Sequence, residues 1–191
     1  MRHSPRYAAL TAAILVLGAC SSTPSTRNKS ASPGVKAVST AQRATIHLAA
    51  ASGSLVSGTL TAVPMGDGVH LTGQLGGLGA NTTHAIHIHE RGDCSAADAS
   101  SAGGHFNPAN SPHGRVGQGA HHGGDMDNIV ANADGVANVD AHASGVTLGG
   151  GAANDVAGKA VVVHAAPDDY SSQPAGNAGA RVACGVITVT Q

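Results

Sequence analysis

The chain has 191 residues, a formal net charge of −1 at neutral pH, and a composition that is 41% hydrophobic but only 2% aromatic. From Ala44 onward four basic residues stand against all eleven acidic ones, and this negative balance excludes a nucleic-acid-binding surface. A folded domain must build its core from Ala, Val, Ile and Leu, and so thin a core predicts that further cross-links contribute to stability.

The N-terminus has the pattern of a secretory signal peptide, because two arginines precede the apolar run Tyr7–Leu17. That run is too short to span a bilayer comfortably. The letters LGAC at 17–20 resemble a bacterial lipobox, in which cleavage precedes the cysteine and Cys20 carries lipid. An ordinary signal peptide with an incidental cysteine is the alternative. We therefore expect residues 1–19 to be a lipoprotein signal peptide, and the mature chain to be anchored to a bacterial membrane, in the periplasm or at the cell surface.

Residues 20–43 are rich in Ser, Thr, Pro and Ala, with too little apolar content to fold, and are expected to form a disordered tether. Residues 44–191, roughly 148 in number, suit one domain with one core. With Cys20 lipidated, Cys94 and Cys184 remain as an even pair that suits an oxidising compartment.

The folded part reads as short strands with no convincing helix, which is typical of a β-sandwich or barrel. Expected strands cover 44–51, 54–63, 69–75, 84–89, 159–164 and 185–190, with a hairpin within 128–141. Residues 90–125 lack apolar periodicity, and so long a loop in a compact domain indicates a functional one. A second, polar loop is expected over 168–181.

The stretch HAIHIHERGDC, at 84–94, places His87 and His89 two residues apart on an expected strand. Period two puts both imidazoles on one face, where they can chelate one metal ion. Imidazole suits copper and zinc better than magnesium or calcium. The pair alone could equally be a surface or packing feature, so its meaning depends on the polar residues that follow.

Five more candidate ligands follow in order: His105, His113, His122, Asp125 and His164. The set resembles the copper-zinc superoxide dismutase family, which has a strand His-x-His, a bridging histidine, a loop of zinc ligands and a late copper histidine. The stretch GNAGARVACGVI, at 176–187, is family-like nearly residue for residue, and the resemblance runs over 44–191. It implies an all-β, eight-stranded Greek-key barrel with a long metal-binding loop and a short electrostatic loop.

The resemblance also implies two metals that share one ligand. Copper would be held by His87, His89, His105 and His164, and zinc by His105, His113, His122 and Asp125. Only imidazole offers two ring nitrogens that can each hold a metal. Copper would take an electron from one superoxide and give it to the next, yielding dioxygen and hydrogen peroxide. In the family the bridging histidine takes up a proton when copper is reduced, and zinc, which has no redox chemistry, fixes the loop.

Other residues gain roles from the same resemblance. His121 competes with His122 for the zinc role, and the spacing to Asp125 favours His122. Asp168 matches a carboxylate that joins a copper histidine to a zinc histidine, whereas its neighbour Asp169 reads as a solvated loop residue. The resemblance gives His84 a structural hydrogen bond.

Arg181 matches the family's arginine beside the copper, where a fixed cation can steer superoxide through an otherwise acidic surface. The loop over 168–181 has no Lys or Glu, so Arg91 and Arg115 are weaker candidates for further guidance.

The resemblance pairs Cys94 with Cys184 in a disulfide. Three further histidines have no assigned partner and read as ordinary surface or strand residues: His47, His70 and His142.

The main hypothesis is a lipid-anchored superoxide dismutase acting on superoxide, with no nucleic-acid partner and with monomer and homodimer both open. The alternative is a non-catalytic periplasmic copper/zinc-binding protein on the same fold. A purely structural envelope lipoprotein would leave six aligned histidines unexplained. The presence of all seven ligands and of Arg181 favours the enzyme, because a domain that lost catalysis is expected to lose such positions first.

Overall fold

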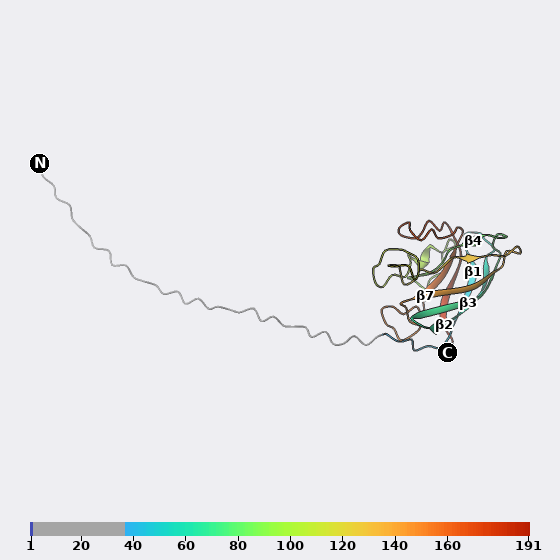
Figure 1. Cartoon of the computed structure of the whole chain (residues 1–191), viewed down its shortest axis with the longest axis horizontal. Coiled ribbons are helices and arrows are strands. Elements are labelled where there is room, and N and C mark those ends of the chain that lie inside the picture. Colours follow the sequence, from blue (N-terminus) through green and yellow to red (C-terminus); the bar gives the residue numbers. More distant parts are fainter. Residues whose placement is uncertain (2–36) are drawn as a thin grey trace. The chain divides into compact units, whose positions relative to one another are not determined.

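The computed structural model describes Met1 and residues 37–191, and the segment 37–191 forms a β-structure (Figure 1). The expected signal peptide, the lipidated Cys20 and most of the expected tether lie outside the described residues. Within the described part, the helical structure is one short 3₁₀ turn, Ser100–Ala102. No helix there is long and apolar enough to cross a membrane.

Seven antiparallel strands form one sheet in the order β5-β8-β9-β1-β2-β3-β7, and β4 pairs with β6 in a separate small ladder. The strands are β1 (Ala44–Ala50), β2 (Ser57–Met65), β3 (Gly68–Gly76), β4 (Thr83–His84), β5 (Ile86–His89), β6 (Ile129–Val130), β7 (Ala137–Ser144), β8 (Ala160–His164) and β9 (Arg181–Val189).

The small β4–β6 ladder joins the two edges of the large sheet. Strands β4 and β5 are interrupted only by Ala85, while β6 runs through a turn into β7 and is tied to it by an Ala131–Ala137 bridge. Counting β4 and β5 as one interrupted strand, eight strands follow one another around the sheet. This confirms the all-β, barrel-type prediction, and a closed sheet leaves no unpaired edge strand.

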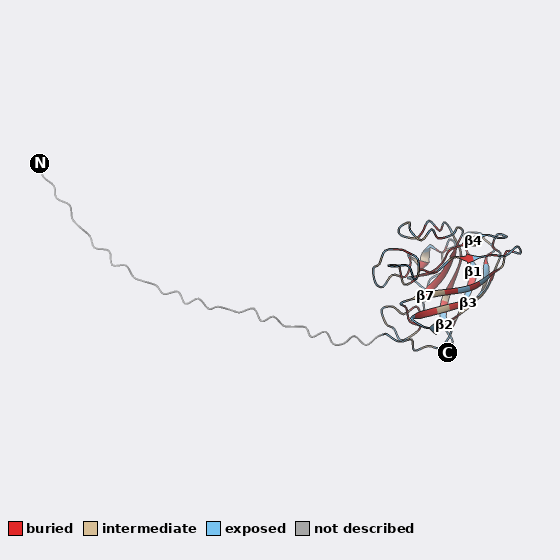
Figure 2. Ribbon diagram, in the orientation of Figure 1, coloured by how far each residue is buried: buried red, intermediate tan, exposed pale blue. Residues whose placement is uncertain are grey.

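The core lies inside this curled sheet and is aliphatic, as the composition predicts. Along β7, buried Ala137, Val139, Ala141 and Ala143 alternate with outward-facing polar residues (Figure 2). Phe106 is the single aromatic residue of the described core. The largest fully buried aliphatic side chains are Ile46, Leu60, Leu71, Leu75, Ile86, Ile88, Leu148 and Ile187.

The last strand begins earlier than the sequence predicts. The polar loop was expected to run through Arg181 with strand structure only from Gly185, but β9 starts at Arg181 itself. The cause is pairing on both sides, because β9 pairs with β1 at Cys184 and with β8 at Arg181. The arginine side chain therefore projects from the end of a strand that has two neighbours.

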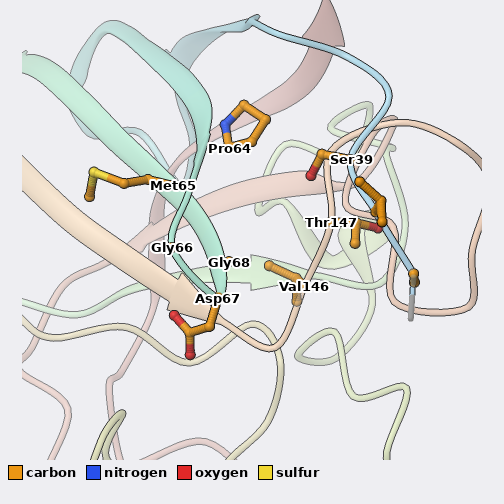
Figure 3. A pocket seen from close by; sticks show the side chains of 10 residues that line it. Ser39, Pro64, Met65, Gly66, Asp67, Gly68, Val146 and Thr147 are labelled. Carbon is orange, nitrogen blue, oxygen red and sulfur yellow. The ribbon is translucent and has the colours of Figure 1, made fainter. Parts of the chain in front are cut away.

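The segment just before β1 is bound to the barrel. The backbone amides of Thr40 and Ala41 donate to the carbonyl of Leu148, and that of Gln42 donates to the carbonyl of Gln191. Beside this segment a cavity of about 440 Å³ is bordered by the β2–β3 turn and the residues around Val146 (Figure 3).

Two glycines on the β2–β3 ladder test how tightly its strands approach. A Cβ added at Gly58 would stand 2.1 Å from the backbone oxygen of Gln74, whereas one added at Gly76 would meet nothing within 4 Å. We expect Gly58→Ala to lower the free energy of unfolding by about 1–3 kcal/mol, because the strands must separate. Gly76→Ala should change it by less than about 0.5 kcal/mol. Urea unfolding of the metal-free chain checks this, and equal effects of the two variants would contradict the described register.

Candidate metal centre

Two neighbouring strands, β5 and β8, carry three of the histidines. His87 and His89 alternate with buried isoleucines on β5, and β5 pairs antiparallel with β8, which ends in His164. The backbone amide of His164 donates to the carbonyl of Ala85 at 2.9 Å, and the Nδ1 of His84 donates to the carbonyl of His164 at 2.8 Å. The expected structural hydrogen bond of His84 is thus present.

The long loop brings a fourth histidine beside these three. A β-bridge pairs His105 with His89. The backbone amide of Ile88 donates to the carbonyl of Gly124, and its carbonyl accepts from the amide of Phe106, both at 2.8 Å. One ligand atom from each residue of this first group then lies within 4.8 Å of all the others, and all four residues are buried: His87, His89, His105 and His164.

Each imidazole of the first group uses one nitrogen for a local contact and leaves the other without a partner. The Nε2 of His87 donates to Asp168 (2.8 Å), and the Nδ1 of His89 donates to the carbonyl of Gly103 (2.9 Å). The nitrogens that remain are buried and make no hydrogen bond: His87 Nδ1, His89 Nε2, His105 Nε2 and His164 Nε2. Since an unpaired buried nitrogen is costly, four of them gathered together fit a nitrogen-binding metal such as copper.

The second group is centred on one oxygen of Asp125. Its Oδ1 lies 2.8 Å from the Nδ1 of His105, 3.1 Å from that of His113 and 3.2 Å from that of His122. A tetrahedral zinc site with bonds of about 2.0 Å requires ligand atoms about 3.3 Å apart. Three nitrogens and one carboxylate oxygen are therefore spaced as zinc ligands, and His105 belongs to both groups.

His121 lies outside this second group. Its Nδ1 donates to the backbone carbonyl of His122 (2.7 Å), and its Nε2 is 3.3 Å from the hydroxyl of Ser144. Asp125 holds the segment in place, because its Oδ2 accepts the backbone amides of His122 and Gly114.

Asp168 links the two groups. It is 3% exposed, and its two oxygens accept from the Nε2 atoms of His87 and His113 at 2.8 and 2.9 Å. Carboxylates in this position orient imidazoles and raise their basicity. Gly176 lies against the bridge so closely that a Cβ there would stand within van der Waals overlap of Asp168 Oδ1 and 2.8 Å from His113 Nε2.

Burial favours the neutral, metal-binding form of three histidines in the first group: His87, His89 and His164. Burial lowers the pKa of His87 to about 4 and that of His164 to about 3, and it lowers the pKa of His89 further still. Opposing burial, hydrogen bonds from His105 and two backbone amides hold the pKa of Asp125 well below its usual range. For His113, burial is outweighed by Asp168 and Asp125, and the pKa is raised.

Two amide side chains that the sequence did not single out hold the backbone at these ligands. The side-chain amide of Gln173 accepts from the backbone N–H of His113 and donates to its carbonyl, both at 2.9 Å. In the same way, the side-chain amide of Asn128 accepts from the backbone N–H of Asp168 at 2.8 Å and donates to its carbonyl at 2.9 Å. No spacing rule points to either residue, since each acts through another residue's backbone.

Arg181 lies next to the first group. Its guanidinium donates to the carbonyls of Ala99 (2.7 Å) and Gly103 (2.6 Å), and Gly103 also accepts from His89. Burial lowers its pKa from the ordinary arginine value. A cavity of about 400 Å³ opens beside it and is lined by His89, Gly104, His105, Asn107, His122, His164, Pro174, Ala175, Gly179 and Arg181.

The two weaker arginine candidates lie beside carboxylates. The Nε of Arg115 pairs with Asp127 at 2.8 Å, and that of Arg91 lies 3.7 Å from Glu90. Both pairs are largely solvent-exposed, so Arg181 is the arginine that shares a cavity with the buried histidines.

The predicted disulfide is confirmed. Cys94 is bonded to Cys184 across 90 residues, with Cα atoms 5.7 Å apart. The bond ties the long loop to β9, so the carbonyls that receive Arg181 and the strand that carries Arg181 are covalently linked.

Comparisons with known proteins decide the family. The copper/zinc superoxide dismutase (SODC) profile matches residues 56–187. The chain belongs to the copper/zinc superoxide dismutase family. It is 43% identical to "Superoxide dismutase [Cu-Zn]" of Caulobacter vibrioides over 136 residues, 69% of this chain and 78% of that one. It is 47% identical to "Superoxide dismutase [Cu-Zn] 2" of Aquifex aeolicus over 114 residues, 58% of this chain and 67% of that one.

Solved structures share the same superoxide dismutase fold. A SOD-like protein from Bacillus subtilis has a TM-score of 0.68 at 33% identity, over 75% of this chain and 97% of that one. The clock protein EA4 has a TM-score of 0.69 at 35% identity, over 81% and 98%. As a family member, the chain is a superoxide dismutase, an oxidoreductase whose metals are copper and zinc.

Two glycines of one loop test the Asp168 bridge. Gly176 and Gly179 both have positive φ, but a Cβ at Gly179 would meet nothing closer than 3.6 Å. Gly176→Ala should therefore displace Asp168 and lower zinc affinity about 10- to 100-fold, as loss of a ligand-orienting partner does. Gly179→Ala carries the same backbone strain without the clash. Competition with a zinc chelator measures both, and equal affinities would show that the bridge does not support the ligands.

Proposed function

We propose that the two buried groups divide the metals between them. His87 Nδ1 and the Nε2 atoms of His89, His105 and His164 hold copper. The Nδ1 atoms of His105, His113 and His122, together with Asp125, hold zinc. One observation supports this proposal most strongly: four buried imidazole nitrogens without hydrogen-bond partners lie within 4.8 Å of one another, next to a cavity that Arg181 also lines.

The protein residues prepare the site for superoxide. When bound, copper supplies a one-electron couple that accepts an electron from one superoxide and returns it to a second. The reaction consumes two superoxide ions and two protons and yields dioxygen and hydrogen peroxide. His105 Nε2 would carry one of these protons to the product when it is free of copper, while Asp125 lies at the opposite edge of the ring, beside Nδ1. Asp168 accepts hydrogen bonds from the Nε2 atoms of His87 and His113, so both imidazole rings keep their orientation during turnover.

Arg181 attracts and positions the anion. Its guanidinium is fixed by two carbonyl oxygens of the long loop and lines the same cavity as His89 and His164. A fixed cation in a concave, partly desolvated site raises the local concentration of an anionic substrate. This matters here because the rest of the domain is acidic and repels superoxide.

Superoxide decay per bound copper tests the activity. The full chain loaded with copper and zinc should react at about 10⁸ to 10⁹ M⁻¹s⁻¹, a diffusional range for which superoxide dismutase is itself a standard example. Arg181→Ala should lower this rate about tenfold and weaken its salt dependence. Arg181→Lys should restore part of it.

Arg91→Ala is the matched control, because it also removes one positive charge but from an exposed position beside Glu90. Pulse radiolysis at several ionic strengths measures all four proteins. Full occupancy by both metals with no decay above that of free copper would instead indicate a copper/zinc-binding protein without catalysis.

We further propose that the mature chain is lipidated at Cys20 and works at a membrane surface outside the cytoplasm. The LGAC stretch and the even cysteine pair support this, since the Cys94–Cys184 bond requires oxidising conditions. Cys20→Ser should move the protein from the detergent phase to the aqueous phase on phase partitioning. Mass spectrometry should find the N-terminus of the wild type at a diacylated Cys20. An unmodified cysteine, or partitioning that the substitution leaves unchanged, would contradict the anchor.

A further inference from the structure

A second set of histidines lies on the outer face of the sheet, away from the metal centre. His70 on β3 and His142 on β7 are directly opposite each other in the antiparallel ladder. Buried Leu71 and Ala141 follow and precede them on the inner face, so the two imidazoles face outward. Their side chains are 18% and 29% exposed. The sequence alone assigns neither residue a partner.

Each of these imidazoles is held by a carboxylate. The Nε2 of His70 is 2.8 Å from Asp140 Oδ1, and the Nε2 of His142 is 2.9 Å from Asp67 Oδ1. Asp67 lies in the β2–β3 turn, and its side chain points away from Ser39 and Pro64, which line the nearby cavity (Figure 3). Histidines that bind metals regularly use one nitrogen for such a carboxylate and the other for the ion.

The second nitrogen of each ring has no hydrogen-bond partner. In the described part of the chain, eight buried side-chain nitrogen or oxygen atoms lack one. Five belong to the histidines of the metal centre, two are the Nδ1 atoms of His70 and His142, and the last is the hydroxyl of Thr147. Both rings therefore repeat the pattern of His87, which has one nitrogen on a carboxylate and one buried without a partner.

The separation of the rings also matches that of imidazoles in the metal centre. The ring centroids of His70 and His142 are 6.1 Å apart with an interplanar angle of 37°. Histidine rings in contact within one ligand group of the centre have centroids from 4.0 Å apart, for His87 and His105, to 6.4 Å, for His105 and His164. Directly opposite positions on antiparallel strands favour this approach, because their Cβ atoms lie about 4.5–5.5 Å apart.

We propose that His70 and His142 form a third metal site, which binds one divalent first-row transition ion through two imidazole nitrogens. Groups of three or more ligand side chains occur, in the described residues, only at the central site, so water completes the coordination here. Binding is weaker than at the buried centre because only two protein side chains hold the ion. Copper(II) binds more tightly than zinc, following the general order for nitrogen ligands. Asp67 and Asp140 orient the rings and offset the charge of the ion.

Copper(II) binding to the full chain, already loaded with its copper and zinc, tests the site. Equilibrium dialysis against Cu²⁺ buffered by a weak chelator counts the additional ions. Wild type should bind one more Cu²⁺ than the double variant His70→Gln, His142→Gln, and the single variant His142→Gln should lose the same ion because chelation needs both rings. Because the result is the difference between the copper counts of wild type and variant, ions held elsewhere on the chain do not affect it.

His47→Gln is the matched control, since His47 is an outward-facing strand histidine whose Nδ1 lies 3.1 Å from the Thr59 hydroxyl. It should keep the additional ion, and superoxide turnover should be unchanged in every variant. Equal copper counts in the wild type and the double variant would overturn the site, as would equal loss in His47→Gln.

A measurement on the wild type keeps the test independent of variant folding. Substoichiometric Cu²⁺ should broaden the imidazole resonances of His70 and His142 together, before those of His47. Broadening that spreads evenly over all exposed histidines would overturn the proposal.

Discussion

The structure depends on His105, whose two ring nitrogens face two different ligand groups. Its Nδ1 is 2.8 Å from Asp125, and its Nε2 is among the unpartnered nitrogens that gather with His87, His89 and His164. A backbone bridge to His89 fixes where the ring lies. One side chain therefore belongs to both ligand groups and connects the long loop to the barrel.

The loop between β5 and β6 has almost no aliphatic core of its own. Its polar ligand side chains take over the role of such a core in holding the loop in place. Each buried nitrogen without a partner costs about 1–3 kcal/mol when the site is empty, and metal binding removes this cost. Binding free energy then becomes folding free energy for the loop. The Cys94–Cys184 bond and the hydrogen bonds of Gln173 and Asn128 hold the same segments in place from the protein side.

The sequence predicts features that depend on neighbouring residues better than features that depend on contacts between distant strands. The period-two pair His87 and His89 and the hairpin around Asp134 are local patterns, and both are found where expected. Resemblance to the family adds the distant residues, including the cysteine pair. What escapes prediction depends on pairing across the sheet: Arg181 lies on a strand because β1 and β8 flank it, and His70 meets His142 only through the β3–β7 register.

A crystal structure of the copper- and zinc-loaded chain, with anomalous data collected at both metal edges, would test the proposed metal assignment most directly. We expect a copper peak bonded to His87 Nδ1 and to the Nε2 atoms of His89, His105 and His164. We expect a zinc peak among the Nδ1 atoms of His105, His113 and His122 and the carboxylate of Asp125. Metals bound through other atoms, or a His105 that contacts neither metal, would contradict this assignment.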